Sequence, residues 1–142
     1  MDDLFLIGVD PLIHQCMREL ASEFEMKDLG LMYYFLGLEV WQRPGEIFLS
    51  QGKYIVKLLE IFGMVDYKSV STPMELNFKN LSGNADGPLL ANPTEYHQLV
   101  GALVFLVNTR SDICFAVNTL SQHMVDAHNI HWVGAKKLLR YL

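Results

Sequence analysis

The feature that most constrains this chain is a polar stretch from Val65 to Asn92, which separates two segments rich in apolar residues. The stretch is dense in residue types that favour turns and surface loops: Ser71, Thr72, Pro73, Asn77, Asn80, Ser82, Gly83, Asn84, Asp86, Gly87 and Pro88. A loop of this length is uncommon inside a compact domain. It therefore predicts a boundary or a mobile connector between two differently built parts.

The first part begins with patterns of a strand and a helix. Residues 3 to 9 (Asp-Leu-Phe-Leu-Ile-Gly-Val) are typical of a short buried strand. Asp10 followed by Pro11 predicts the start of a helix, with an acidic N-cap and proline at the first helical position. Apolar residues then recur at helical spacing: Leu12, Ile13, Cys16, Met17, Leu20 and Phe24.

A β-hairpin and a second helix follow. Residues 31 to 40 are rich in aromatic and apolar types suited to strands, and Ile47-Phe48-Leu49 continues that character. Arg43-Pro44-Gly45-Glu46 between them predicts a turn, which gives a hairpin. Ser50 is the expected cap of a helix that runs to about Phe62 and ends at Gly63.

The second part predicts three packed helices. The first begins at Asn92-Pro93-Thr94-Glu95, an N-cap, a proline and a capping-box acid, and its apolar stripe is Tyr96, Leu99, Val100, Leu103 and Val107. After a break at residues 108 to 111, the next helix presents Ile113, Ala116, Val117 and Leu120 on one face. A third helix follows residues 126 to 129 and runs to the end.

Composition and charge limit the class of protein. Of the 142 residues, 51% are hydrophobic and 19% are charged, which is typical of a globular protein. No apolar run reaches the roughly 18 residues that a membrane span needs. The net charge of −5 argues against an autonomous nucleic-acid binder, because phosphate contact needs clustered cations. The excess of negative charge lies entirely in residues 1 to 71, which contain six basic and eleven acidic side chains.

The cellular compartment is inferred from the first residues and the cysteines. Two acids follow Met1, so the sequence resembles neither a signal peptide nor a transit peptide. Cys16 and Cys114 lie on expected amphipathic helices, where a reduced and buried thiol is the ordinary interpretation. We therefore expect an intracellular protein of the cytoplasm or nucleus that is not secreted and does not enter a membrane.

Two groups of residues allow competing chemical interpretations. Asp2-Asp3 are either a solvated chain end or a pair of carboxylates that converge on a divalent cation such as Mg²⁺ from a tight turn. A histidine-rich segment suggests zinc, but it lacks cysteine and matches no common ligand spacing: His123, Asp126, His128 and His131. Aromatic residues near the hairpin could stack on bases, although cross-strand pairing is the more ordinary role: Tyr33, Tyr34, Phe35 and Trp41.

Ordered blocks along nearly the whole chain carry a specific resemblance. Asp-Asp-Leu-Phe-Leu-Ile-Gly at 2 to 8 resembles the turn after Tyr-Val in the Tyr-Val-Asp-Asp motif of copia-type retrotransposon reverse transcriptases. Further blocks of that family follow in order: residues 24–30, 34–40, 47–51, Lys53-Tyr54, Thr72-Pro73-Met74, Tyr96, 99–101, Thr109-Arg110, Asp112-Ile113, 115–117, Ser121-Gln122, His131-Trp132 and 139–142. The chain is therefore identified as similar to part of the RNA-directed DNA polymerase of a retrotransposon Pol polyprotein, a nucleotidyltransferase.

The resemblance implies roles for residues of the first part. Asp2 and Asp3 match two adjacent palm carboxylates that help to hold two Mg²⁺ ions, which serve the primer 3′-hydroxyl and the incoming deoxynucleoside triphosphate (dNTP). Lys27 would assist the leaving pyrophosphate, or it is a plain surface lysine. The hairpin of residues 34 to 51 is similar to the primer grip, in which Gly37 would let the backbone approach the primer or would mark a strand bulge.

The resemblance also implies that the helices contact the RNA or DNA template–primer duplex. Residues 51 to 62 and 95 to 142 correspond to thumb and connection helices. The candidates for phosphate contact are cations on those segments, each of which could instead be a solvated charge: Lys53, Lys57, Arg110, Lys136, Lys137 and Arg140. Arg110 has a further alternative, a structural salt bridge to Asp112 or a helix-capping role.

Departures from the family pattern limit the expected activity. The Tyr-Val pair, the third metal-binding aspartate, the fingers and the ribonuclease H domain have no counterpart here, while Ala102 replaces a usual lysine and Ser111 a usual proline. We therefore expect a polymerase fragment that does not polymerise alone and whose partners are the remaining palm, fingers and ribonuclease H portions of Pol. The alternatives are a module that binds nucleic acid or a polymerase partner, and a non-functional relic.

The expected fold class is α+β with two regions. Residues 1 to 50 would form a partial palm with the primer-grip-like hairpin. Residues 51 to 142 would form a mostly helical, thumb-like or connection-like region with the linker at about 65 to 92. A cut palm sheet would leave an exposed strand edge that favours association with other chains.

Overall fold

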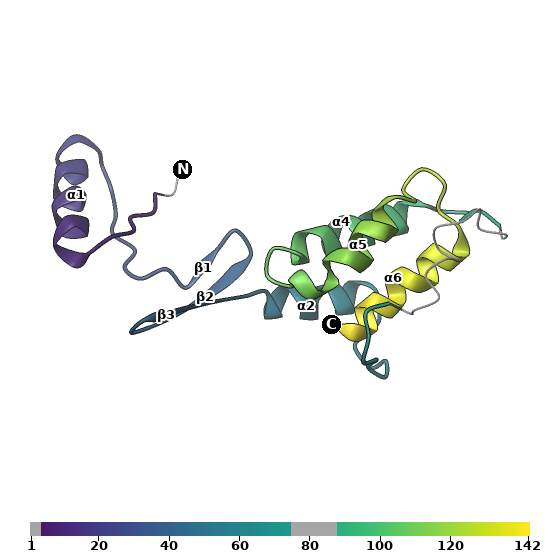
Figure 1. Ribbon diagram of the computed structural model, residues 1–142. Helices are drawn as coiled ribbons and strands as arrows, with labels where there is room; N and C mark the ends of the chain where they lie inside the picture. Colours follow the sequence, from purple (N-terminus) through teal and green to yellow (C-terminus); the bar gives the residue numbers. More distant parts are fainter. Residues whose placement is uncertain (1–3, 75–87) are drawn as a thin grey trace. The chain divides into compact units, whose positions relative to one another are not determined.

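The computed structural model describes residues 4–74 and 88–142 (Figure 1). The chain divides into two compact units, Met1–Met32 and Tyr33–Leu142, so the hairpin belongs with the helices that follow it. Helices and a small antiparallel sheet make up the described residues, which confirms the α+β class. Within those residues, no helix is both long and apolar enough to cross a membrane.

Helix α1, Asp10–Glu23, is the main element of the first unit. The helix starts where the sequence predicts, but its N-cap is Val9, so Asp10 and Pro11 are its first two residues instead of the N-cap and the first. The backbone N–H of Phe24 donates to the carbonyl of Leu20 at the helix end. None of its residues is buried. The amphipathic stripe is therefore present but has no apolar layer against it among the described residues of this unit.

The strand expected at residues 3 to 9 is wrong for residues 4–9, the part that the structure describes. That segment is extended without strand pairing, and Ile7 is 98% exposed. A strand requires a hydrogen-bonded neighbour, because a single extended segment leaves its backbone groups unpaired. An apolar run indicates that a segment is suited to a strand. The strand forms only where a neighbouring strand offers backbone hydrogen bonds.

The second unit opens with the predicted hairpin, now as a three-stranded antiparallel sheet in the order β1-β2-β3. The strands are β1 Tyr34–Phe35, β2 Leu38–Arg43 and β3 Glu46–Ser50. Leu36 and Gly37, at φ +47° and +83°, form a tight turn before β2 that the sequence analysis did not predict. Trp41 lies directly opposite Phe48, which is the cross-strand pairing considered for this aromatic residue.

Helix α2, Gly52–Ile61, follows the hairpin without a break. Its N-cap is Gln51 and not the expected Ser50, although the Ser50 hydroxyl accepts a hydrogen bond from the backbone N–H of Gly52 at 3.2 Å. Gly63 has φ +61°, the left-handed conformation that ends many helices, so the predicted stop is confirmed.

The described residues from 88 to 142 form three helices: α4 Thr94–Leu106, α5 Cys114–Ser121 and α6 Asn129–Tyr141, with a 3-10 turn, η1 Ser111–Ile113, before α5 (Figure 1). They pack on one another around the predicted stripes. Val107 of these stripes is half-buried, and the other members are at most 2% exposed: Tyr96, Leu99, Val100, Leu103, Ile113, Ala116, Val117 and Leu120. Burial of each large apolar side chain contributes about 1.5–3 kcal/mol. The prediction of three packed helices is confirmed.

The described parts of the polar stretch run along the helices as irregular chain. The backbone N–H of Val70 donates to the carbonyl of Arg140, and that of Leu90 donates to the carbonyl of Ala127. Leu89 forms an isolated antiparallel bridge with His128. Several residues used to predict the linker, including Asn77, lie outside the described residues.

The expected burial of the two cysteines is wrong. Cys16 is half-buried and Cys114 is exposed, and both are free thiols. Cys114 is the first residue of α5, at the edge of the face that buries Ile113, Ala116 and Val117. Helical periodicity showed the apolar stripe, but the cysteine lies beside it rather than within it.

Candidate functional site

The predicted metal ligands, Asp2 and Asp3, lie outside the described residues. Among residues 4–74 and 88–142, no group of three or more His, Cys, Asp or Glu side chains is placed to hold a metal ion. Lys27 is described: it is exposed, in the irregular segment between α1 and β1. The site that can be built from the structure is therefore the set of cations predicted to contact nucleic acid, together with Gly37.

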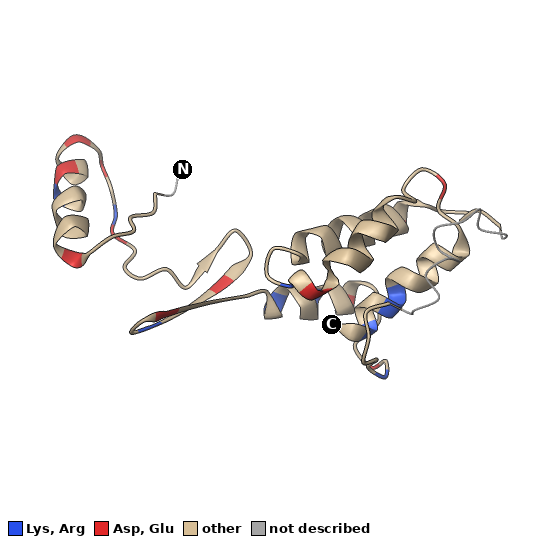
Figure 2. Ribbon diagram, viewed as in Figure 1, with Lys and Arg blue, Asp and Glu red and all other residues tan. Residues whose placement is uncertain are grey.

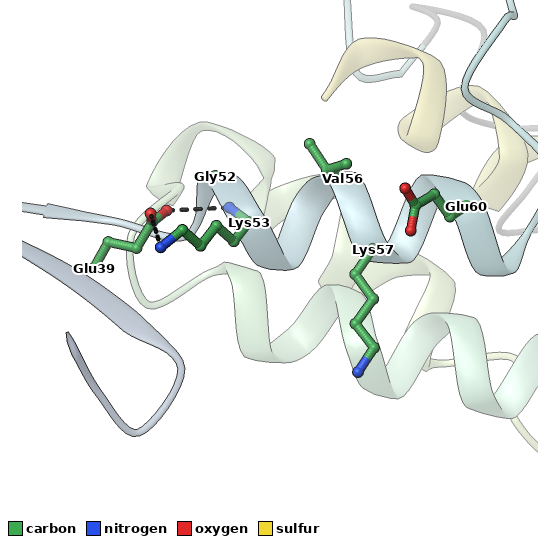
Figure 3. Close-up of a pocket in the computed structure, with 6 residues that line it drawn as sticks. All are labelled: Glu39, Gly52, Lys53, Val56, Lys57 and Glu60. Atoms are coloured by element: carbon green, nitrogen blue, oxygen red, sulfur yellow. Dashed lines mark hydrogen bonds and ion pairs between the residues drawn. The ribbon is translucent and has the colours of Figure 1, made fainter.

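Lys53 lies at the start of α2, where Glu39 from β2 holds it (Figure 3). Its Nζ is 3.6 Å from Glu39 Oε1, and its backbone N–H donates to Glu39 Oε2 at 3.1 Å. A carboxylate at a helix start is favoured, because the first N–H groups carry partial positive charge. The Lys53 side chain remains 79% exposed, so this pairing leaves its ammonium group open to solvent.

A shallow surface depression continues from this pair along α2. It is lined by Glu39, Gly52, Lys53, Val56, Lys57 and Glu60 (Figure 3). Lys57 points away from Glu39, so its charge is not held by that carboxylate. Acidic and basic side chains are mixed here, so the depression is neither uniformly positive nor uniformly negative in charge.

Gly37 makes its close approach to a side chain of α4. A Cβ at this position would lie 3.0 Å from Cζ and 3.2 Å from Cε1 of Phe105. The Phe105 ring also meets Tyr54 edge-on, with ring centroids 5.0 Å apart. A larger residue at position 37 is therefore disfavoured by the positive φ and by the nearby Phe105 ring. Both constraints come from this chain itself and involve no bound primer.

Arg110 forms a bidentate pair with Asp112. Its Nε and Nη2 donate to the two carboxylate oxygens at 2.9 and 2.8 Å, and the Tyr141 hydroxyl donates to the same carboxylate at 2.9 Å. These donors hold the pKa of Asp112 at about 2, below its ordinary value, with the Arg110 hydrogen bonds as the largest cause. The hydrogen bond to Asp112 in turn raises the pKa of Arg110. The salt bridge considered for Arg110 is therefore present.

The three cations of the last turns lie on α6 (Figure 2). Lys136 Nζ lies 4.8 Å from the centre of the Trp132 ring, a cation–π geometry. Arg140 Nε donates to the carbonyl of Lys68 at 2.8 Å, so this residue also fixes the irregular chain after α2. All three side chains are half-buried, and Lys137 is the next residue after Lys136. The structure places these cations on one helix, where Lys136 and Arg140 also make contacts within the chain.

The histidine-rich segment forms the start of α6. His128 and His131 form a reciprocal capping box, and the backbone N–H of His128 donates to Nδ1 of His131. The rings of His123 and His131 stack with centroids 3.8 Å apart. Stacked rings direct their nitrogen lone pairs side by side rather than towards a common point, so this geometry does not form a chelate.

Several residues that organise the site were not predicted as site residues. Glu39 bonds the start of α2, and Tyr141 bonds Asp112, the partner of Arg110. Gln51, which follows the hairpin, bonds Phe105 and Thr109. The sequence carries one signal that could have indicated Gln51 as a site residue: it is a polar residue between a strand and a helix. Periodicity carries no information about the others, because their partners are distant in sequence.

Comparison with known proteins gives consistent matches. A family described as Reverse transcriptase (RNA-dependent DNA polymerase) matches residues 1–76. The chain is 41% identical over its whole length to the Retrovirus-related Pol polyprotein from transposon RE1 of Arabidopsis thaliana, of which it covers 10%. It is 38% identical to the Uncharacterized mitochondrial protein AtMg00810 of the same plant and 37% identical to the Putative transposon Ty5-1 protein YCL074W of Saccharomyces cerevisiae. It spans 58% and 46% of those two, and no solved structure gives a significant match.

Proposed function

This chain belongs to the reverse transcriptase family, of the copia type that its sequence blocks predict, and we propose that it acts as one section of a retrotransposon RNA-directed DNA polymerase. The family match and the identity to a transposon Pol polyprotein support this proposal. The share of that polyprotein that the chain spans, 10%, supports the view that other sections contribute to activity.

The distribution of apolar side chains is the structural observation that carries the proposal. Residues 4–49 contain 16 of the 26 large hydrophobic residues that are exposed in the described parts, but one of the 16 buried core residues, Val40. Exposed apolar surface of this extent marks an interaction site in most proteins. We infer that α1 and the hairpin pack against further palm and fingers polypeptide of the polymerase, while α4, α5 and α6 supply their own core.

The proposed metal site needs ligands from beyond this chain's described residues. Asp2 and Asp3 supply hard carboxylate oxygens, the donor type that Mg²⁺ prefers. Two carboxylates make an incomplete set, and the described residues offer no three-residue cluster to extend it. The proposal is therefore that these two residues bind divalent metal when another section of the polymerase provides the missing ligand. Polymerisation by the chain alone is not expected.

Nucleic-acid contact is proposed for the cations of α2 and α6. Lys53 and Lys57 are exposed on α2, and Lys136 and Lys137 lie on the last helix. Lysines on helix surfaces suit contact with a phosphate backbone, which needs charge rather than a fixed hydrogen-bond pattern. The net charge of −5 predicts that such binding is weak and depends strongly on salt.

Complementation tests the proposed function directly. The chain is mixed with a separately produced polypeptide that carries the preceding palm and fingers region of the transposon RE1 polyprotein, and primer extension is measured with Mg²⁺. Extension is expected from the mixture and from neither component alone. Asp2→Asn and Asp3→Asn should each abolish it, because each removes a metal-ligand charge.

Asp66→Asn is the matched control, since Asp66 is an exposed acid in the irregular chain after α2. It should leave extension by the mixture unchanged. Extension that survives Asp2→Asn and Asp3→Asn would contradict the metal role of the pair. A mixture that binds together but never extends a primer would contradict the proposed function itself.

A further inference from the structure

Gln51 is a buried polar residue at the junction of the hairpin and α2. It lies between Ser50, the last residue of β3, and Gly52, the first of α2, and it is 2% exposed. Burial of a carboxamide that makes no hydrogen bonds is strongly unfavourable, because the group gives up its hydrogen bonds to water. The position of this side chain therefore depends on its partners.

Both ends of the Gln51 carboxamide are bonded to the last turn of α4 and the turn that follows it. Its Oε1 accepts a hydrogen bond from the hydroxyl of Thr109 at 2.6 Å, and its Nε2 donates to the carbonyl of Phe105 at 3.3 Å. These bonds join positions 58 and 54 residues apart in the sequence. They connect the exit of the hairpin to the helical core.

A second contact with the same residue of α4 comes from the same end of the sheet. The turn between β1 and β2 places Gly37 against the Phe105 ring, so Phe105 contacts the hairpin with its ring and Gln51 with its carbonyl. Val40 is the one hairpin residue among the buried hydrophobics, and Ile47 and Phe48 at the far end are 71% and 65% exposed. Glu39 adds a contact between the same end of the hairpin and α2, through the backbone N–H and the Nζ of Lys53.

We propose that Gln51, held by Thr109 and Phe105, is a positioning residue that fixes the orientation of the β1–β3 hairpin on α4. The inference rests on the proposed polymerase role, in which the hairpin, by its similarity to a primer grip, would contact the primer. Loss of the Gln51 hydrogen bonds frees the hairpin to move as a unit. The core of α4, α5 and α6 stays intact, since its apolar packing does not involve this side chain.

Segment-resolved hydrogen exchange on the whole chain tests this proposal. Thr109→Val removes the hydroxyl donor without a change of shape, and Gln51→Met removes both hydrogen bonds at similar size. Each should speed amide exchange in residues 34–50 by about threefold to tenfold, the effect of losing one or two hydrogen bonds. Exchange in α4, α5 and α6 should stay within about twofold of wild type, less than the loss of a single hydrogen bond would produce.

Two further variants serve as controls. Thr109→Ser keeps the hydroxyl and should restore slow exchange in the hairpin. Thr119→Val removes another threonine hydroxyl, which donates to the Phe115 carbonyl within α5, and it should leave the hairpin unaffected. Thr109 is half-buried at the end of a helix, so its valine variant remains informative even where Gln51→Met fails to fold.

The outcome separates this inference from the proposed function. Hairpin exchange equal to wild type in Thr109→Val, or an equal increase in every segment, would overturn the positioning role. Exchange is measured without nucleic acid, so neither result depends on primer contact. A loosened hairpin with unchanged duplex binding would support the positioning role and contradict the proposed primer contact.

Discussion

Arg110 illustrates how a predicted ligand residue can also serve the fold. Its guanidinium group holds Asp112 with two hydrogen bonds and lies 5.5 Å from the centre of the Tyr141 ring. Planar bidentate geometry is the arrangement in which arginine and carboxylate interact most strongly. The sequence could suggest the Asp112 pair, two residues away, but not the third member from α6. Phosphate contact by Arg110 stays a prediction.

Asp112 predicts a specific dependence of stability on acid. Its pKa is lowered from 3.8 to about 2, so it stabilises the fold above its unfolded pKa and loses that contribution as the pH falls from about 4 through about 2. Asp112→Asn should reduce the free energy of unfolding at pH 7 by about 0.5–1 kcal/mol, because the side chain is 42% exposed. It should also flatten the decline between pH 4 and pH 2.

Urea unfolding at several pH values from 2 to 7 measures this effect. Asp66→Asn, at an exposed acid, is the control and should keep the wild-type decline. A variant curve parallel to that of wild type across pH 2 to 4 would show that Asp112 does not carry the acid dependence.

At the scale of elements, two glycines of the hairpin share the left-handed backbone conformation. They differ in the atoms that an added Cβ would meet. Gly37 and Gly45 have φ +83° and +79°, and a Cβ would meet the Phe105 ring at Gly37 but nothing within 4 Å at Gly45. Gly45→Ala should cost about 1 kcal/mol of stability through backbone strain alone. Gly37→Ala should cost about 1 kcal/mol more, because the Phe105 ring must move.

Thermal unfolding of the two alanine variants compares these costs. Adding Phe105→Leu to Gly37→Ala should recover part of the loss, as the smaller side chain leaves room for the new methyl group. Equal destabilisation by Gly37→Ala and Gly45→Ala would mean that the contact with α4 contributes nothing.

Helix α4 shows the difference between apolar residues on its two faces. Leu99 is fully buried among α4, α5 and α6, while Val104 is 51% exposed. Leu99→Ala should lower the free energy of unfolding by about 2–5 kcal/mol through lost burial and a cavity. Val104→Ala should change it by about 0.5 kcal/mol or less, as is usual for surface positions. Chemical denaturation measures the free energy of unfolding of both variants. Similar decreases for the two would contradict the assignment of Leu99 to the core.

At the scale of the whole molecule, the charge distribution predicts weak and salt-sensitive binding to a template–primer duplex. The double variant Lys136→Gln with Lys137→Gln should lower affinity and reduce the slope of log affinity against log salt by about 2, roughly 1 for each phosphate contact. Fluorescence anisotropy with a labelled duplex at several salt concentrations provides the measurement. Arg18→Gln on α1 is the control cation, and an equal loss there would indicate unspecific charge effects.

The sequence by itself determined the helices, the hairpin and the family. Helical spacing, the proline and acid at the start of α1 and the glycine after α2 act within a few residues, so they can be read without a structure. Tertiary structure alone decided which of these elements acquire partners. Residues 4–9 have the composition of a strand but are not part of a described sheet, and Gln51 is buried because Thr109 and Phe105, more than 50 residues away, satisfy its carboxamide. Such long-range contacts depend on packing geometry, which local sequence patterns do not encode.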